Sequence, residues 1–165
     1  MCEAGQVTVW LLVGLTGSGK TTFASRLVAR GVVRLSVDEE VFAQHGRYGI
    51  DYHESEWPKK EAPVVEEIYR RLVGLVEADR DVVLDAALWR RTERDKVKEL
   101  VEAAGGTWRL IYFDVSRDEL LRRLAERNRR EDANALLVTP EALDDFIARF
   151  EVPSGEGEEL LSETL

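Results

Sequence analysis

Apolar residues along this chain gather in four short runs that are rich in β-branched and aromatic side chains, a pattern typical of buried strands. The runs are Val7–Val13, Val32–Val37, Asp81–Asp85 and Thr107–Val115. Elsewhere apolar residues recur at helical spacing, which predicts helices at about 20–30, 61–78, 92–104, from 116 onward and 139–150. Because strands that are apolar almost throughout alternate with helices, the pattern predicts an α/β fold with a parallel sheet covered on both faces.

Two connections are too long to be simple turns, and long connections in a compact domain commonly carry function. Residues 39–58 form an acidic, aromatic stretch, and residues 127–138 form a basic stretch followed by a polar one. The 165 residues fit one domain, which we place at 1–152. Residues 153–165 begin with a run of Pro, Ser, Gly and Glu and are predicted to be a flexible tail.

The composition narrows the classes of function. The chain has 32 Asp and Glu against 23 Lys and Arg residues, a formal net charge of −9, which disfavours non-specific binding to nucleic acid. Cys2, His45 and His53 are its only cysteine and histidines, so a zinc site is not expected. The apolar run Val7–Val13 is too short for a membrane span and follows an acidic residue, unlike a signal peptide. We therefore expect a cytoplasmic protein.

The segment from Gly14 to Thr21 matches the phosphate-binding pattern G-x-x-x-x-G-K-[ST] at every fixed position. It follows an apolar strand and opens a helix, so its amides and the positive end of the helix dipole converge on phosphate oxygens. Lys20 is expected to reach the β- and γ-phosphates. The residues expected to bind the nucleotide here are Gly14, Thr16, Gly17, Ser18, Gly19, Lys20, Thr21 and Thr22. The alternative is a strand-to-helix turn with an incidental lysine.

Thr21 and Asp85 are the candidate Mg²⁺ ligands. A hydroxyl at the end of the motif ligates Mg²⁺, and so does an Asp at the end of an apolar strand in such proteins, directly or through water. An Asp in this place is also typical of a turn or a helix cap. Because Ala86 follows Asp85, the Asp-Glu pair with which many motor ATPases activate water is absent. No Asn-Lys-x-Asp motif reads guanine either, so the sequence favours a small phosphotransferase.

Asp38 ends the second predicted strand. In a parallel sheet, this edge also holds the phosphate-binding loop, since ligands bind beyond the carboxyl ends of the strands. A carboxylate there is suited to accept a proton from a substrate hydroxyl that attacks the γ-phosphate. The alternative is that Asp38 only caps a helix that starts at Glu39.

Five arginines cluster near the end of the fourth predicted helix: Arg122, Arg123, Arg127, Arg129 and Arg130. Phosphoryl transfer spreads negative charge over the equatorial oxygens, and a guanidinium group stabilises that charge. Helical spacing lets Arg127 and Arg130 project together, with Arg123 one turn earlier. The residues that follow, about 127–138, are expected to close as a lid that excludes water. The alternative is a solvated helix face on which Glu119 and Glu126 pair with the arginines.

These motifs occur together in an order that resembles the AAA_33-type P-loop kinases. The resemblance rests on the phosphate-binding loop, the strand ends at Asp38 and Asp85, the pair Arg91-x-x-Arg94, the segment Leu120–Arg130 and Phe150–Pro153. This group is similar to the kinase domain of phage polynucleotide kinase, to chloramphenicol phosphotransferase and to zeta toxin. The resemblance covers nearly the whole chain.

The resemblance implies a P-loop NTPase fold in three α/β/α layers, with strand order 2-3-1-4 and a fifth strand that is short or missing. It implies ATP with Mg²⁺ and phosphorylation of a hydroxyl group. It places the general base on Asp38 and the lid arginines on Arg127 and Arg130. It also suggests that Arg91 and Arg94 face phosphate or substrate, and that Phe150–Pro153 lies near the adenine. For the assembly we expect a monomer or homodimer.

Residues 36–67 are expected to form the acceptor side. They contain nine acidic residues against three basic ones, together with Tyr48, Tyr52 and Trp57, which favours a small, cationic, hydroxylated acceptor. The alternative is a solvated acidic face with its aromatic residues in the core. Three functions stay open: a small-molecule hydroxyl kinase, a 5′-hydroxyl polynucleotide kinase and a non-catalytic ATP-binding module.

Overall fold

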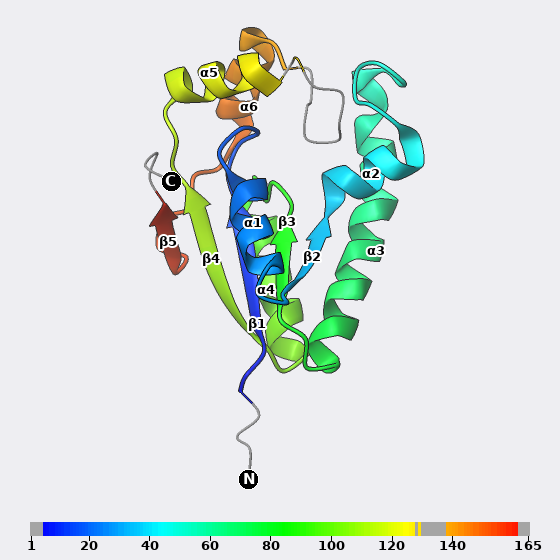
Figure 1. The fold of residues 1–165 in the computed structure, drawn as a ribbon, viewed down its shortest axis with the longest axis vertical. Helices are drawn as coiled ribbons and strands as arrows, with labels where there is room; N and C mark the ends of the chain where they lie inside the picture. Colours follow the sequence, from blue (N-terminus) through cyan, green and yellow to red (C-terminus); the bar gives the residue numbers. More distant parts are fainter. Residues whose placement is uncertain (1–4, 128, 130–137, 162–165) are drawn as a thin grey trace.

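Five parallel strands form one sheet at the centre of the molecule, in the order β2-β3-β1-β4-β5 (Figure 1). The computed structural model describes residues 5–127, 129 and 138–161. The strands are β1 (Thr8–Val13), β2 (Val33–Ser36), β3 (Val82–Asp85), β4 (Thr107–Phe113) and β5 (Glu158–Leu161). The predicted order 2-3-1-4 is confirmed, and a fifth strand of only 4 residues extends the sheet beyond β4.

Helices cover both faces of the sheet, which gives the three predicted layers (Figure 1). Helix α1 (Lys20–Val28) lies on one face, and α3 (Trp57–Glu77) and α4 (Arg91–Ala103) lie on the other. The other helices are α2 (Val37–His45), α5 (Arg117–Arg127) and α6 (Pro140–Arg149), with a short 3₁₀ turn η1 at Glu54–Glu56. Figure 1 shows α5 and α6 beyond the carboxyl ends of the central strands and α2 at the carboxyl end of β2, beside α3. Ligands bind at this edge in such sheets.

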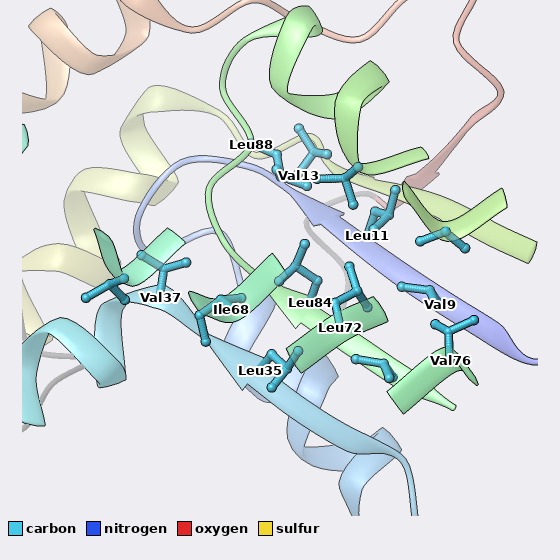
Figure 2. Close-up of a cluster of buried hydrophobic side chains, with 14 of the residues drawn as sticks. Val9, Leu11, Val13, Leu35, Val37, Ile68, Leu72, Val76, Leu84 and Leu88 are labelled. Carbon is cyan, nitrogen blue, oxygen red and sulfur yellow. The ribbon is translucent and has the colours of Figure 1, made fainter. Parts of the chain in front are cut away.

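Alternate residues of the central strands supply the two halves of the core. Leu11 and Leu84 point to the face covered by α3 and α4, whereas Leu12 and Val83 pack under α1. Figure 2 shows the first half, in which Ile68 and Leu72 of α3 lie against the strands. Both faces of β1 are buried because it is a central strand, which explains its continuous apolar sequence.

Between β2 and α3 the structure differs from the prediction. Helix α2 begins at Val37, so the predicted strand ends one residue earlier, at Ser36, whose side chain accepts a hydrogen bond from the Glu39 amide at 3.3 Å. Helix α3 begins at Trp57 instead of about residue 61. Its first turn is mostly polar and exposed, so it carries no apolar periodicity that would have indicated a helix.

The prediction of a loose tail from residue 153 is wrong for the residues that the structure describes. Strand β5 pairs with β4, with Glu158 opposite Leu110 and Leu161 opposite Phe113. Just before it, Glu156 is buried and its carboxylate accepts hydrogen bonds from Arg94 at 2.9 and 3.0 Å. The acidic composition of this segment suggested solvation, but a buried guanidinium in α4 neutralises one of its carboxylates.

Helices α5 and α6 pack on each other through Leu120, Leu124 and Leu143, and Leu15 of the phosphate-binding loop joins this small cluster. The predicted cap of α6 is confirmed, since the Thr139 hydroxyl accepts a hydrogen bond from the Ala142 amide at 3.1 Å. This packing fixes the base of α5 beside the loop. Across the described part of the chain, no helix combines the length and apolar character that a membrane span requires.

Candidate active site

The phosphate-binding loop connects β1 to α1 between Val13 and Lys20. Gly17 and Gly19 have φ angles of +84° and +106°, a region that residues with a side chain rarely adopt. At Gly14, an added Cβ would lie 2.6 Å from Ser18 Oγ and 3.1 Å from Phe113 Cβ, so the close approach of these side chains favours glycine there too. The glycines of the motif are therefore explained by the shape of the loop itself.

Two side chains of this loop are suited to phosphate. Lys20 Nζ donates hydrogen bonds to the carbonyl oxygens of Gly14 and Leu15 at 2.9 and 3.0 Å, which holds the ammonium over the loop. Burial lowers the pKa of Lys20, while the carboxylates of Asp85 and Asp38 act to raise it. Ser18 Oγ is buried and makes no hydrogen bond to the described protein atoms. A buried ammonium and an unpartnered hydroxyl in a loop that precedes a helix N-terminus fit a polyphosphate group.

Thr21 and Asp85, the predicted Mg²⁺ ligands, are brought together by the fold. Thr21 Oγ1 lies 3.4 Å from Asp85 Oδ2, across the junction of α1 and β3. A hydroxyl and a carboxylate oxygen suit Mg²⁺, which prefers oxygen ligands and usually keeps several waters. The described residues contain no group of three His, Cys, Asp or Glu side chains that could hold a metal by themselves. A Mg²⁺ ion held here would therefore take its other ligands from phosphate and water.

Arg34 is a residue of this site that the sequence reasoning missed. Its Nη2 donates to Asp85 Oδ2 at 2.7 Å, and its Nη1 donates to Glu39 Oε1 at 2.7 Å. The guanidinium thus connects the end of β3 to the first turn of α2. A single charged residue inside the apolar strand 32–37 was the signal available in the sequence, because a charge is rarely placed in a buried strand without a partner.

Asp38 lies in the first turn of α2, and Ser36 rather than Asp38 is the helix cap. The Asp38 side chain lines the same cavity as the phosphate-binding loop and Asp85. Although the residue is exposed, protein atoms around the cavity restrict hydration of its carboxyl group, and this desolvation raises its pKa above 3.8. The Asp85 carboxylate raises the pKa further, whereas Lys20 and Arg127 act to lower it. The capping alternative is thereby excluded, and the role of Asp38 as a base stays a prediction.

The cavity has a volume of about 430 Å³ and lies between the loop, Asp38 and α5. Arg123 Nη1 donates to the Gly17 carbonyl oxygen at 3.2 Å, and Arg127 Nη1 lies 3.4 Å from Thr16 Oγ1. Both predicted arginines therefore sit directly over the loop. Arg122 also lines the cavity but is exposed and pairs with Glu119 at 2.6 Å, as in the alternative of a solvated face. Arg130 falls outside the described residues.

A second, apolar cavity of about 220 Å³ adjoins the first, and Ser18 lines both. Its walls include Tyr112, Phe150 and Val152, and the rings of Tyr112 and Phe150 are stacked 5.9 Å apart. A flat aromatic group is suited to pack against apolar and aromatic walls of this kind. The segment 150–153, which the resemblance places near the adenine, thus contributes to a cavity beside the phosphate loop.

The expectation from the resemblance is wrong for Arg94, which faces the protein interior. Arg91 does not line the phosphate cavity, and a contact between Arg91 and the acceptor stays a prediction. Arg94 is fully buried and donates to Glu156 and to the carbonyl oxygens of Leu88 and Trp89. Arg91 is exposed, and its backbone amide donates to Glu151 Oε2 at 2.8 Å. The role of Arg94 is structural, because the Glu156 carboxylate and two carbonyl oxygens bind its guanidinium inside the protein.

The sheet order and the loop, with an acidic residue at the end of β3, define a P-loop kinase fold. The profile of the family AAA_33, described as an AAA domain, matches residues 9–153. The chain belongs to this family.

Solved structures of similar fold include several kinases. A candidate kinase from Chloroflexus aurantiacus J-10-fl is 18% identical with a TM-score of 0.74, over 95% of this chain and 87% of that one. A chain of the Pnkp1/Rnl/Hen1 RNA repair complex is 22% identical with a TM-score of 0.70, over 87% of this chain and 44% of that one. The Mycobacterium tuberculosis APS kinase CysC, in complex with AMPPNP and APS, is 15% identical with a TM-score of 0.66, over 97% and 90%. No curated protein matches the sequence.

Proposed function

We propose that the protein is an ATP-dependent phosphotransferase that moves the γ-phosphate of ATP to a hydroxyl group of a small, positively charged molecule. The observation that carries the proposal is the position of Asp38, whose side chain lines one cavity together with Lys20, Arg127 and the phosphate-binding loop. A carboxylate that shares a cavity with phosphate-binding groups is suited to deprotonate an attacking hydroxyl. The kinase fold of the similar structures supports the same reaction class.

In the proposed reaction, Asp38 accepts the hydroxyl proton as the acceptor oxygen forms a bond to the γ-phosphorus. The bond between that phosphorus and its bridging oxygen breaks, and ADP leaves with the electron pair. Lys20, Arg123 and Arg127 stabilise the negative charge that spreads over the oxygens of the transferred group. We assign the same role to Arg130 on the sequence alone.

Thr21 and Asp85 would hold Mg²⁺, which when bound neutralises charge on the phosphate oxygens. Ala86, which follows Asp85, has no side chain that could activate a water molecule. This favours transfer to an alcohol over hydrolysis. The residues of the predicted lid, 127–138, lie mostly outside the described residues, and their role in excluding water stays a prediction.

A 5′-hydroxyl polynucleotide kinase is the second candidate. The fold shared with a chain of an RNA repair complex supports it. The charge of the acceptor side opposes it, because residues 36–67 carry nine acidic side chains against three basic ones, and such a surface repels phosphates.

The test is a transfer assay with γ-labelled ATP and Mg²⁺, comparing a panel of small amino alcohols and polyols with a 5′-hydroxyl oligonucleotide. We expect label on the small alcohols. Label on the oligonucleotide alone would favour the second candidate. ATP binding without label on any acceptor would support a non-catalytic binding module.

A further inference from the structure

An aromatic cluster stands beside Asp38 at the carboxyl edge of the sheet. The Tyr52 and Trp57 rings are stacked with centroids 6.4 Å apart, and the Tyr48 and Trp57 rings meet edge to face with centroids 5.4 Å apart. Tyr52 is only 9% exposed, and its buried hydroxyl makes no hydrogen bond to the described protein atoms. Burying a hydroxyl without a partner is unfavourable, so this group is suited to a ligand.

The Tyr52 hydroxyl lies in an acidic environment. Asp38 is the charged group that acts most strongly on it, and Glu61 acts on it as well. The pKa of Tyr52 is raised to about 12, first by burial and then by Asp38. A hydroxyl that keeps its proton at neutral pH can donate to an incoming oxygen or nitrogen.

Glu61 is the second carboxylate of this corner. The Trp57 side chain donates a hydrogen bond to it, and Asp38 of α2 and Glu93 of α4 both repel its charge. Within the described ranges, no Lys or Arg lies at ion-pair distance from Glu61. Lys60 Nζ lies over the Tyr52 ring, 5.3 Å from its centroid. An ammonium group therefore fits against the aromatic face of this cluster.

We propose that Glu61 and the Tyr52 hydroxyl form a specificity site for a protonated amine carried by the acceptor, next to the hydroxyl that is phosphorylated. The proposal rests on the phosphotransferase function and adds the chemical class of the acceptor, an amino alcohol. An ammonium group has three donors and one positive charge, so it can satisfy Glu61 and Tyr52 and relieve the repulsion from Asp38. A neutral polyol can satisfy the hydroxyl only.

Burial, and then the Asp38 carboxylate, raise the pKa of Glu61 to about 7. This direction is expected for two neighbouring carboxyl groups, Glu61 and Asp38, when no cation is bound to Glu61. A bound ammonium favours the ionised carboxylate. Acceptor binding is therefore expected to strengthen as pH rises from about 6 to 8, in parallel with ionisation of Glu61.

The test compares alcohols that differ only by an amine in place of a hydroxyl, serinol against glycerol and glucosamine against glucose. Kinetics of transfer are measured for the wild type, Glu61→Gln, Tyr52→Phe and the control Glu66→Gln, an exposed acid of the same helix. We expect the wild type to prefer the amine by about 10- to 100-fold in kcat/KM, the range for a hydrogen bond to a charged group. Glu61→Gln should remove this preference by raising KM, with kcat and the neutral alcohols little changed.

Calorimetry with serinol and glucosamine, in the presence of Mg²⁺ and a non-hydrolysable ATP analogue, separates this proposal from the phosphotransferase function. One outcome is that the amines bind to the wild type but not to Glu61→Gln, while no alcohol is phosphorylated. This outcome would refute the phosphotransferase function and support the amine site. Transfer that favours neutral alcohols, an amine preference that survives Glu61→Gln, or no binding of either amine would overturn the amine site.

Discussion

Arg34 and Asp85 form an ion pair between neighbouring strands, with Arg34 Nη2 2.7 Å from Asp85 Oδ2. Both side chains are largely buried, at 16% and 7% exposure. The second amino group of the same guanidinium contacts Glu39 of α2, one residue after Asp38. A single arginine thus couples the predicted Mg²⁺ ligand to the helix that carries the predicted base.

Replacement of Arg34 should destabilise the fold. Arg34→Met leaves the Asp85 carboxylate buried without its cation, so we expect a loss of about 2–4 kcal/mol in the free energy of unfolding. Urea denaturation measures this loss. Arg34→Lys keeps the charge but not the two-sided contact and should lie between the wild type and Arg34→Met.

The matched control is Arg70→Met. Arg70 pairs with Glu67 at 2.6 Å, but its side chain is 70% exposed, so the loss should be at most about 1 kcal/mol. Equal losses for Arg34→Met and Arg70→Met would contradict the idea that Arg34 compensates a buried charge.

Removal of the proposed base should separate binding from turnover. Asp38→Ala should lower kcat by about 10²- to 10⁴-fold, the range for a general base, and leave ATP affinity nearly unchanged. Lys20→Ala should weaken both, since the proposed contact between Lys20 and the phosphates is made in the ground state and in the transition state. Calorimetry gives the affinity and labelled ATP gives the rate. Full transfer activity in Asp38→Ala would show that another group takes the proton.

The pH dependence of the reaction provides a second measure of Asp38. Desolvation and Asp85 raise the pKa of Asp38 above its ordinary 3.8, so the proton acceptor is lost at a higher pH than for a solvated aspartate. With a neutral alcohol as acceptor, whose binding does not require ionised Glu61, we expect the acid limb of kcat/KM to lie above pH 3.8 and to disappear from the residual activity of Asp38→Asn.

Glu61 should make stability depend on pH. Burial, and then Asp38, raise its pKa from 4.5 to about 7, with Glu93 of α4 acting in the same direction and the hydrogen bond from Trp57 opposing it. The folded state therefore binds a proton that the unfolded chain releases. The stability from this group is fully present below pH 4.5 and is lost as pH rises through about 7.

Glu61→Gln does not titrate, so its stability relative to the wild type should increase by about 1–3 kcal/mol between pH 5 and pH 8. Urea denaturation at the two pH values measures the change, and Glu66→Gln, at an exposed position of α3, is the control. A difference between Glu61→Gln and the wild type that stays constant with pH would contradict the raised pKa.

The carboxyl-terminal segment should stabilise the domain through Glu156. Its carboxylate pairs with Arg94, and the two side chains are 2% and 1% exposed. Glu156→Gln leaves the buried guanidinium without a full negative partner, so we expect a loss of about 3 kcal/mol in thermal or urea unfolding. Glu159→Gln, which breaks the half-exposed pair with Arg109, should change stability by less than about 1 kcal/mol. Comparable losses would mean that the segment is only loosely attached.

The sequence by itself determined the parts of the protein whose signals are local. The phosphate-binding motif could be identified because its backbone permits few residue types. The apolar strand before Gly14 and the helix after Lys20 stand in the sequence where this motif requires them. The strand order followed from the same motif by resemblance, and the α6 cap at Thr139 followed from capping chemistry.

The tertiary structure alone decided how distant charges are paired. Arg34 with Asp85 and Arg94 with Glu156 are separated by 51 and 62 residues. A charge inside an apolar strand signals that Arg34 needs a partner, but no local pattern says which residue that partner is. The acidic segment around Glu156 looked solvated and Arg94 looked functional, yet each neutralises the other inside the protein. Composition records how many charges a chain has, whereas burial, which sets the energy of each charge, depends on which partner the fold brings to it.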